Sequence, residues 1–287
     1  MTVEELMRQA VKRLTEEYGE REAKALVDEM MLQIKGWDKT KTLINGVKTA
    51  SNFLEARVWA TVKQLLEGYP IQYIFGKAHS YGMDINVTPD TLIPRQETSQ
   101  LVDMIMDRYK KVTDLKVLDL GTGSGCIAIA LGRHLTFPNE ITAVDISEKA
   151  LEVAKQNANN FNVKITFVHA DMLQWENLID RYLYRRYDII VSNPPYIAQR
   201  EAARMERNVL EHEPATALFV PDDDPLVFYR AIAVIAEKRL EDKGTLFLEI
   251  NPLFAKELAA MLREHGFHDV DIEKDMQKAD RFIIARR

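Results

Sequence analysis

The tetrapeptide Asn193-Pro194-Pro195-Tyr196 directly follows YDIIVS, an apolar and β-branched run at positions 187–192. Such a run predicts a buried strand, and prolines end strands because they lack the N–H that a sheet ladder needs. Strand termination requires neither the amide before the prolines nor the phenol after them. The side-chain oxygen of Asn193 and the carbonyl of Pro194 can each accept one N–H of a planar –NH2 group. The four residues therefore predict a clamp for an amide or amino nitrogen, with Tyr196 covering its face.

A glycine-rich turn lies upstream, where the predicted strand KVLDL runs into GTGSGCIAIAL. Glycine lets the backbone turn sharply and approach a ligand, with a helix N-terminus directly behind it. The dinucleotide fingerprint G-x-G-x-x-G fails because its third glycine would fall at Cys126, and the Lys-Ser/Thr pair of a phosphate-binding loop does not follow. The candidate cofactor-binding residues of this turn are Gly121, Thr122, Gly123, Ser124 and Gly125.

Acidic residues end the next two predicted strands. Asp145 follows Gly125 by 20 residues, where a carboxylate can accept hydrogen bonds from both hydroxyls of a ribose. With the glycine turn, it indicates an adenosine ligand without a pyrophosphate, and S-adenosylmethionine fits that description. The plainer alternative is a glycine turn beside an ordinary surface aspartate. Asp171, at the end of the third strand, could meet the adenine amino group or could equally cap the segment that follows.

A methyl donor beside the Asn-Pro-Pro-Tyr clamp would explain its residues. A nitrogen conjugated to a carbonyl or an aromatic ring is a poor nucleophile, because its lone pair is delocalised. Fixing it in line with the methyl group can supply roughly 7–11 kcal/mol of the barrier in ideal intramolecular cases. Tyr196 could also face the sulfonium, with a cation–π contribution of about 0.5–2 kcal/mol. No general base is needed, since a methylated amide nitrogen can lose its proton to water. We therefore expect N-methylation, with Asn193 to Tyr196 as catalytic and substrate-binding residues and Asn193 also contacting the cofactor.

These residues need a scaffold that brings strand ends together. From Lys116 onward, short apolar segments alternate with helical patterns; the segments are KVLDL, ITAVD, ITFVHA, YDIIVS and TLFLEI. The alternation predicts a largely parallel sheet with helices on both faces, and ligands of such sheets lie at the carboxyl ends of the strands. The C-terminal DVDIEKDMQKADRFIIARR predicts two further strands joined by a turn.

The N-terminal part of the chain has a different pattern. Apolar residues recur at three- and four-residue steps through residues 2–66 and predict a helical module, which has no nucleotide-binding motif. Thr2 and Glu5 form a capping-box pattern, and Gly36 suits a helix end. Strand-like alternation in residues 71–89, broken by two glycines, predicts a β-hairpin. The expected domains are a helical substrate-docking domain at 1–70, a β-hairpin linker at 71–90 and a methyltransferase domain at 91–287.

The composition argues against several classes of protein. Among 287 residues, 38 are basic and 44 acidic, and this net charge of −6 does not suit a protein that grips nucleic acid through many phosphates. The densest basic cluster, RYLYRRYD at 181–188, fits a helix end before a strand better than a phosphate-binding patch. No stretch approaches the roughly 20 apolar residues of a membrane span. A single cysteine and a charged, amphipathic start predict a cytoplasmic protein. Six scattered histidines without ligand spacing predict no metal site.

With these residues assembled, the chain resembles the peptide chain release factor N5-glutamine methyltransferases, the protein-(glutamine-N5) methyltransferase family. The resemblance runs almost end to end and is carried by GYPIQYIFGKAHSYGMDINVTPDTLIPRQET, VLDLGTGSGCIAIAL, DISEKALEVAKQNA, YDIIVSNPPYI, EHEPATALF, LEI and DRFIIAR. It implies a class I S-adenosylmethionine methyltransferase fold, which is a mostly parallel seven-stranded sheet with helices on both faces. A small N-terminal helical domain and a β-hairpin linker precede it. The resemblance also implies that the glycine turn and Asp145 hold the cofactor, and that Asn193 to Tyr196 hold the glutamine amide.

The activity that the resemblance implies is methylation of the glutamine side-chain amide nitrogen in the Gly-Gly-Gln loop of bacterial class I release factors. The products are the N5-methylated glutamine and S-adenosylhomocysteine. We expect a monomer that acts on a protein rather than on nucleic acid or a membrane. An alternative is a nucleic-acid adenine or guanine methyltransferase that uses the same tetrapeptide on a flipped base. A non-enzymatic binding protein on this core should have lost part of the glycine turn or Asn193, and both are intact.

The chain departs from the family pattern at a few positions. PRQETS stands where the family typically has PRPETE, and Asn251 stands where glycine usually follows LEI. Met172, a candidate cofactor contact, replaces a common aromatic residue, so we expect looser packing against adenine. These departures leave open whether Arg95 and Glu97 have a functional role or form a salt-bridged turn.

Overall fold

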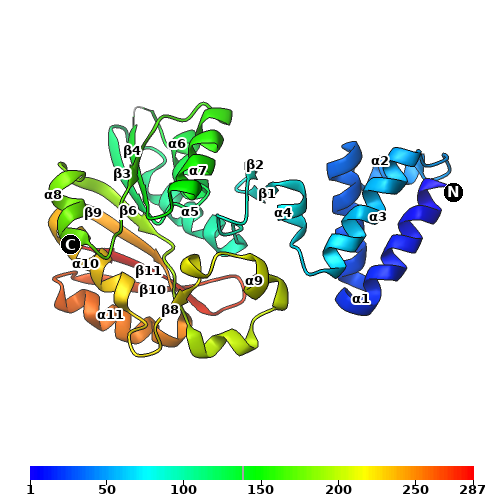
Figure 1. The fold of residues 1–287 in the computed structure, drawn as a ribbon. Coiled ribbons are helices and arrows are strands. Elements are labelled where there is room, and N and C mark those ends of the chain that lie inside the picture. The colour runs from blue at the N-terminus through cyan, green and yellow to red at the C-terminus, as the bar shows by residue number, and fades with distance from the viewer. Residues whose placement is uncertain (138) are drawn as a thin grey trace. The chain divides into compact units, whose positions relative to one another are not determined.

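The computed structural model describes residues 1–137 and 139–287, and the chain divides into two compact units (Figure 1). One unit consists of Met1–Gly76 and Glu206–His212, and the other of Lys77–Met205 and Glu213–Arg287. Each unit has a hydrophobic core of its own. The chain therefore builds the first unit from two segments that are far apart in sequence.

The first unit is helical throughout. Its helices are α1 (Val3–Lys35), α2 (Lys39–Asn45), α3 (Asn52–Leu66), α4 (Ile71–Phe75) and α9 (Arg207–His212). α1 packs against α3, and the core holds fully buried side chains that include Leu6, Leu14, Met30, Met31, Leu54 and Leu65. The ring of His212 in α9 lies against the ring of Tyr69, with 4.1 Å between their centroids. The short helix α2 was not predicted.

The capping residues of α1 behave as their sequence predicts. The Glu5 N–H donates to the Thr2 hydroxyl at 3.2 Å, and the Thr2 N–H donates to Glu5 Oε2 at 2.8 Å, which confirms the capping box. Gly36 ends the helix with φ of 66°, a left-handed conformation that glycine adopts without strain. Gly19, with φ of 74°, interrupts α1 inside its span.

The predicted hairpin is shorter than its sequence pattern suggested. Residues 71–75 form α4 rather than a strand, so the prediction is wrong there. Ile71, Ile74 and Phe75 have the spacing of one helical face, and over five residues this pattern is easily confused with strand alternation. Gly76 ends α4 in the left-handed conformation. The hairpin itself pairs β1 (Lys77–Ser80) with β2 (Met83–Asn86) in antiparallel register.

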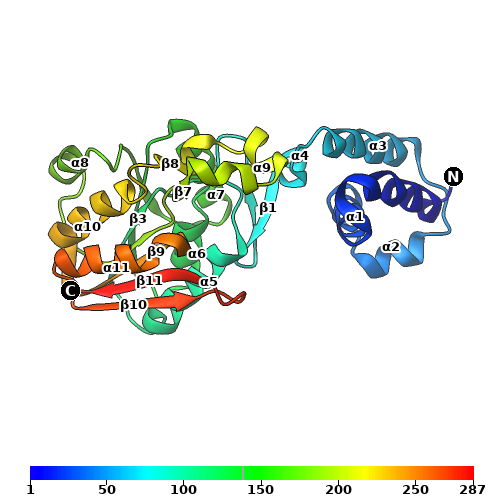
Figure 2. The ribbon, with the colours of Figure 1, turned by 90° about the horizontal axis from the view of Figure 1, so that it is seen from below.

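The second unit is built on a seven-stranded sheet in the order β10-β11-β9-β6-β3-β4-β5. The strands are β3 (Leu115–Leu120), β4 (Asn139–Asp145), β5 (Ile165–His169), β6 (Tyr187–Ser192), β9 (Leu240–Glu249), β10 (Asp269–Lys274) and β11 (Asp280–Arg286). Among the described strands of this sheet, β11 is the one that runs opposite to the other six, and it pairs with β10 at one edge of the sheet (Figure 2). The mostly parallel seven-stranded sheet is confirmed.

Helices cover both faces of this sheet, as predicted (Figure 1). One set consists of α5 (Gln96–Tyr109), α6 (Cys126–His134) and α7 (Glu148–Asn160), and the other of α8 (Trp175–Arg181), α10 (Val227–Arg239) and α11 (Ala255–Glu264). A small parallel pair, β7 (Ile197–Ala198) and β8 (Phe219–Val220), follows the Asn-Pro-Pro-Tyr segment. Short 3-10 turns occupy Gln199–Arg204, Ala215–Ala217 and Pro252–Phe254.

The order in which successive strands are added to the sheet reverses at β3. From β3 the chain continues to β4 and β5 on one side, whereas β6 and β9 lie on the other side. Such a switch point is where doubly wound sheets bind ligands, outside the carboxyl ends of the strands. Leu120 of β3 pairs with Ser192 of β6. This register sets the glycine turn and Asn193 next to each other.

A buried asparagine joins three parts of the second unit. The side chain of Asn157 in α7 accepts from the Asn86 N–H and donates to the carbonyls of Asn86 and Ser124, each at 2.9 Å. Asn157 is fully buried, so these bonds are shielded from water. The residue therefore ties the hairpin and the glycine turn to α7, a role that no sequence pattern indicated.

We expect Asn157→Ala to lower the free energy of unfolding by about 2–4 kcal/mol, because it leaves buried backbone groups of Asn86 and Ser124 without partners. Urea denaturation followed by circular dichroism measures this change. The matched control is Asn160→Ala, an exposed asparagine of the same helix, for which a change within about 0.5 kcal/mol is expected. Equal effects of the two substitutions would contradict the role of Asn157.

Candidate active site

The glycine turn between β3 and α6 has the backbone that its composition predicts. Gly121, Gly123 and Gly125 have φ of 76°, 55° and 82°, in the left-handed region that glycine adopts readily. A Cβ atom on Gly125 would lie 3.1 Å from both the Ala154 Cβ and the Ile129 Cδ1 atoms. At Gly123 a Cβ would meet nothing within 4 Å. The turn is therefore packed tightly against α6 and α7 at Gly125 and open at Gly123.

Asp145 lies directly against this turn. Its Oδ2 atom accepts from the Gly123 N–H at 2.8 Å, and its Oδ1 atom accepts from the Ser147 N–H at 2.9 Å. Burial raises the pKa of the Asp145 carboxyl, and these backbone N–H groups partly oppose that shift. Each carboxylate oxygen has a second lone pair. The structure thus brings two sequence-predicted cofactor residues together and leaves Asp145 able to accept further hydrogen bonds.

Asp171 was expected to end a strand, but β5 ends at His169, and Asp171 and Met172 lie in the turn beyond it. Asp171 Oδ1 accepts from the Leu173 N–H at 2.9 Å and so closes a local turn; the N-cap of α8 is Gln174, so Asp171 is not the helix cap that one interpretation predicted. Met172 is buried, and its Cε atom would lie 3.3 Å from a Cβ on Gly121. Met172 therefore packs against the glycine turn, whereas Asp171 forms the turn that leads towards α8.

Asp119 belongs to the same site, although its position inside a predicted strand gave it no assigned role. Its Oδ2 atom accepts from the Thr122 hydroxyl at 2.6 Å. Its Oδ1 atom is buried and accepts no hydrogen bond of ordinary geometry from the described residues. Burial raises the pKa of Asp119 to about 7. A carboxylate in the apolar strand KVLDL was the available signal, because burying an acid is costly and usually has a functional reason.

These features fit S-adenosylmethionine better than a phosphate-bearing cofactor. Acidic groups surround the turn, at Asp119 and Asp145, where a phosphate would be repelled. A cationic amino acid moiety and a ribose both offer donors to such carboxylates. The opening at Gly123 lets a ligand approach the backbone. The predicted residues Gly121 to Gly125, Asp145 and Met172 are thus grouped at one site.

The Asn-Pro-Pro-Tyr segment begins where β6 ends. The Ser192 hydroxyl donates to the Leu120 carbonyl at 2.6 Å, which links the ends of β6 and β3. The Asn193 side-chain N–H donates to Thr98 Oγ1 at 3.1 Å. The Tyr196 hydroxyl donates to Glu249 Oε1 at 3.1 Å. Both polar side chains of the tetrapeptide are therefore held by residues of other elements.

Glu249, at the end of β9, is the buried centre of these contacts. Its Oε2 atom accepts from the Thr98 hydroxyl at 2.9 Å. Burial raises the pKa of Glu249 to about 7, although the bonds from Thr98 and Tyr196 oppose the shift. Sequence reasoning missed Thr98 and Glu249; they lie within the LIPRQET and LEI stretches but had no role of their own.

Tyr196 cannot serve as a base in this setting. Burial, and then the neighbouring Glu249 carboxylate, raise the pKa of the Tyr196 phenol far above its usual value. The phenol therefore remains protonated and donates its hydrogen bond. Asn251 also supports this residue, because its side-chain N–H donates to the Tyr196 carbonyl at 3.1 Å and to Glu201 Oε1 at 2.8 Å.

Arg95 forms an ion pair, although not the local one with Glu97 that one of the two interpretations predicted. Arg95 donates to the buried carboxylate of Glu213, and the Ile93 N–H donates to the other oxygen of Glu213 at 3.2 Å. The partner of Arg95 is thus Glu213 rather than Glu97. Glu97 lies near enough to Tyr196 and Glu249 to raise the pKa of both.

Other candidate sites have a simpler explanation. Burial raises the pKa of the Cys126 thiol to about 12, so it is no nucleophile. Within the described residues, no group of three His, Cys, Asp or Glu side chains is placed to hold a metal ion. None of the described helices combines the length and apolar character needed to cross a membrane.

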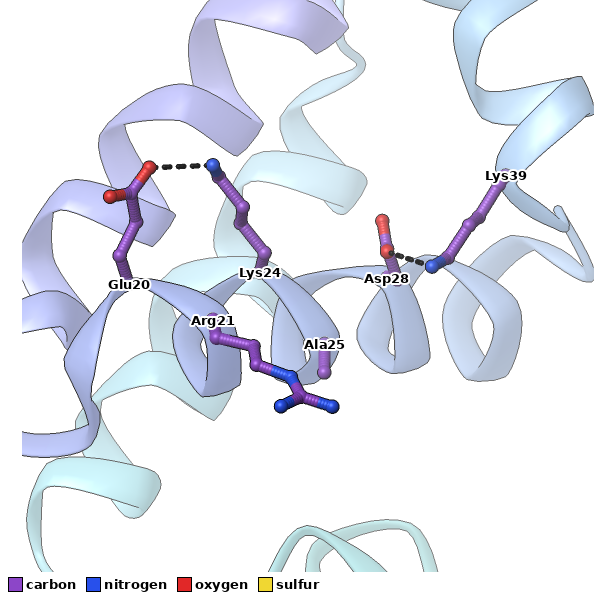
Figure 3. A pocket seen from close by; sticks show the side chains of 6 residues that line it. All are labelled: Glu20, Arg21, Lys24, Ala25, Asp28 and Lys39. Atoms are coloured by element: carbon purple, nitrogen blue, oxygen red, sulfur yellow. Dashed lines mark hydrogen bonds and ion pairs between the residues drawn. The ribbon is translucent and has the colours of Figure 1, made fainter.

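A hollow of about 600 Å³ lies in the first unit (Figure 3). It is lined by Glu20, Arg21, Lys24, Ala25, Asp28 and Lys39. Lys24 pairs with Glu20 at 2.6 Å, and Lys39 pairs with Asp28 at 3.3 Å. The lining has no aromatic ring and no glycine turn, so it offers nothing that would hold a nucleoside.

The fold and the site define an S-adenosylmethionine-dependent methyltransferase. Residues 97–217 match the family model of the methyltransferase small domain. The fold is similar to that of a 16S rRNA methyltransferase from Thermus thermophilus in complex with AdoMet and guanosine, with a TM-score of 0.54 and 20% identity. That match covers 74% of this chain and 49% of the other. The fold is also similar to that of the hMettl16 catalytic domain, with a TM-score of 0.55, 17% identity and 82% of both chains covered.

Relatives of higher identity specify the family. Residues 5–76 match the PrmC N-terminal domain. The release factor glutamine methyltransferase of Flavobacterium psychrophilum is 44% identical over 78% of each chain. The protein of the same name from Deinococcus radiodurans is 31% identical over 100% of this chain and 99% of its own. The chain therefore belongs to the release factor glutamine methyltransferase family, as its sequence predicted.

We expect Asp145→Ala to weaken S-adenosylmethionine binding at least about tenfold, because two acceptors for the ribose hydroxyls are lost. Asp171→Ala is the matched control, and we expect a change within about threefold because its carboxylate closes a local turn at Leu173, whereas Asp145 binds the Gly123 N–H of the glycine turn. Isothermal titration calorimetry measures both affinities. A larger loss for the Asp171 variant would reverse the assignment of the two carboxylates.

Proposed function

We propose that the protein methylates the side-chain amide nitrogen, N5, of the glutamine in the Gly-Gly-Gln loop of bacterial class I peptide chain release factors. S-adenosylmethionine is the methyl donor and S-adenosylhomocysteine the product. Membership of the release factor glutamine methyltransferase family supports this reaction. The observation that supports the site is the orientation of Asn193, whose N–H group is bonded to Thr98.

This orientation leaves Asn193 Oδ1 as an acceptor for the substrate. No donor among the described residues occupies that oxygen. We assign one N–H of the glutamine amide to Asn193 Oδ1 and the other to the Pro194 carbonyl, since both are acceptors beyond the end of β6. Two fixed acceptors hold the amide plane in one orientation, which is the contribution of positioning to such reactions.

The remaining roles follow from the chemistry of the site. The cofactor supplies an electrophilic methyl group on a sulfonium. We assign the glycine turn, Asp119, Asp145 and Met172 to cofactor binding. The protonated Tyr196 covers the amide and donates its hydrogen bond to Glu249. The amide proton leaves to water, so no side chain is required as a base.

The proposal favours a protein substrate over a nucleic acid. The net charge of −6 is unfavourable for phosphate contacts. The rRNA methyltransferase neighbour is similar at the level of fold, which does not identify a substrate. We further propose that the enzyme acts as a monomer in the cytoplasm, where release factors meet the ribosome.

The direct test is to incubate the protein with methyl-labelled S-adenosylmethionine and, separately, a release factor, RNA or DNA. We expect label only in the release factor, and none when the glutamine of its Gly-Gly-Gln loop is replaced. Asn193→Ala should lower the transfer rate at least about 100-fold, because one of the two fixed acceptors is lost, with cofactor affinity within about threefold. Label in RNA or DNA, or full activity of Asn193→Ala, would refute the proposal.

We also propose that the N-terminal helical unit helps to dock the release factor. This unit has no glycine turn and no strand ends, and it exposes large apolar side chains close together in the chain. Their exposed fractions are 82% for Leu43, 67% for Ile44, 79% for Val47 and 64% for Phe53. Isolated exposed apolar residues are ordinary, whereas four within eleven positions suit a contact surface for a protein.

We expect the double substitution Leu43→Ser with Val47→Ser to raise the KM for the release factor about 30-fold, because each of the two apolar contacts contributes about 1 kcal/mol. Cofactor affinity should not change. Phe137→Ser is the matched control, since Phe137 is equally exposed but belongs to the second unit. Steady-state methylation kinetics measure these effects, and an unchanged KM in the double variant would argue against docking through this surface.

A further inference from the structure

The hydrogen bonds of Thr98 determine which way the amide of Asn193 faces. The Thr98 hydroxyl donates its only hydrogen to Glu249 Oε2 at 2.9 Å. The same oxygen can then only accept, so the group of Asn193 beside it must be the NH2, at 3.1 Å. The opposite end of the amide, Oδ1, is consequently turned away from Thr98. An asparagine without such a partner could present either end to a substrate.

Glu249 holds both ends of the Asn-Pro-Pro-Tyr segment at once. One of its oxygens accepts from Thr98 and the other from Tyr196. An ionised carboxylate has no hydrogen to donate, so both neighbouring hydroxyls must point their hydrogens towards it. Glu249 is 1% exposed, so water does not compete for these bonds. The direction of the whole chain of hydrogen bonds therefore originates at this carboxylate.

The groups that face Glu249 come from several elements. Thr98 and Glu97 belong to α5, and Tyr196 follows β6. Arg281 of β11 favours the ionised form of Glu249, whereas Glu97 opposes it. The Tyr229 hydroxyl of α10 donates to the Glu249 main-chain carbonyl at 3.0 Å, and Cys126 of α6 is a neutral thiol nearby. Arg281 is the only cation among these, and it also pairs with Asp275 at 3.3 Å.

We propose that Thr98 and Glu249 are positioning residues for methyl transfer, which fix the Asn193 amide with its Oδ1 towards the substrate nitrogen. This proposal rests on the function proposed above. Neither residue needs to touch the substrate for this role. Thr98 sets the orientation of Asn193, and Glu249 sets the direction of the Thr98 hydroxyl while it anchors Tyr196. The contribution of both residues should therefore appear in kcat rather than in binding.

The same network gives the reaction a characteristic dependence on pH. Burial raises the pKa of Glu249 to about 7. Below that pH the carboxyl is protonated and can donate to Thr98, which frees the Thr98 hydrogen to point at Asn193. The Asn193 amide can then turn over and present its NH2 to the substrate, where an acceptor is needed. Activity should therefore rise as the pH increases through about 7 and Glu249 ionises.

The first experiment compares Thr98→Val with Thr98→Ser in steady-state methylation of a release factor. Valine matches the shape of threonine but has no hydroxyl, so we expect kcat to fall about 10- to 100-fold. The KM for the release factor and the cofactor affinity should stay within about threefold. Thr98→Ser keeps the hydroxyl and should retain most of the activity. The matched control is Ser99→Ala, at the next position of α5, for which no change is expected.

The second experiment measures kcat against pH at saturating cofactor for the wild type and Glu249→Gln. We expect the wild-type rate to rise through about pH 7 and the variant to lose that rise, because glutamine does not ionise. Asp119 also has a pKa of about 7, raised by burial. Asp119 and Asp145, whose pKa burial also raises, both remain in the variant, so a rise that persists in Glu249→Gln does not come from Glu249 and contradicts the proposal.

A third measurement needs no substrate. In the 15N-labelled enzyme, the side-chain NH2 signals of Asn193 are identified by their loss in Asn193→Ala. They should shift through about pH 7 in the wild type and stay constant in Glu249→Gln. A wild type that labels no release factor would refute the proposed function alone. An unchanged kcat in Thr98→Val would refute the positioning network alone. So would Asn193 NH2 signals whose positions do not change as Glu249 ionises.

Discussion

The hydrogen bond from the Ser192 hydroxyl to the Leu120 carbonyl holds the two central strand ends together, and the candidate site depends on it. β3 continues into the glycine turn and β6 into the Asn-Pro-Pro-Tyr segment, so their register sets donor and acceptor groups against each other. A slip by one residue would turn every side chain of β6 to the opposite face. The buried bond and the parallel ladder make that slip costly, which gives the site a rigid base.

Two buried acids, Asp119 and Glu249, and the partly buried Asp145 determine the electrostatics around this base. Asp119, Asp145 and Glu249 all have raised pKa values because burial disfavours their charged forms. Carboxyl groups placed this way lower the stability of the empty protein, and folded proteins retain such groups mainly at functional sites. Two of them lie beside the glycine turn, where a cationic ligand would compensate for their charge. Glu249 instead accepts hydrogen bonds from two neutral groups, the hydroxyls of Thr98 and Tyr196.

More of the fold than of the side-chain contacts within the site could be predicted from the sequence. Each strand from β3 to β9 of the large sheet contains a short apolar run, so the order of these strands along the chain could be predicted. Their bounds were less accurate, since β5 ends at His169, before the predicted Asp171, and β9 begins at Leu240, ahead of the predicted run. The helix at 71–75 could not be predicted, since five residues do not separate a helical period from a strand period. The bonds through Thr98 join residues 95 and 151 positions apart. No local pattern encodes such partners, although the stretches that contain them were recognised.

Helix α9 gives the first unit an unusual covalent architecture. The chain leaves the second unit after Met205, adds Glu206–His212 to the first unit and returns at Glu213. Glu213 then binds Arg95, so the returning chain is anchored at once. An N-terminal unit grafted from another protein would lack the surface that receives His212, and a transplant must carry both segments. The first unit is thus made of two chain segments, and an exchange of residues 1–76 alone would separate them.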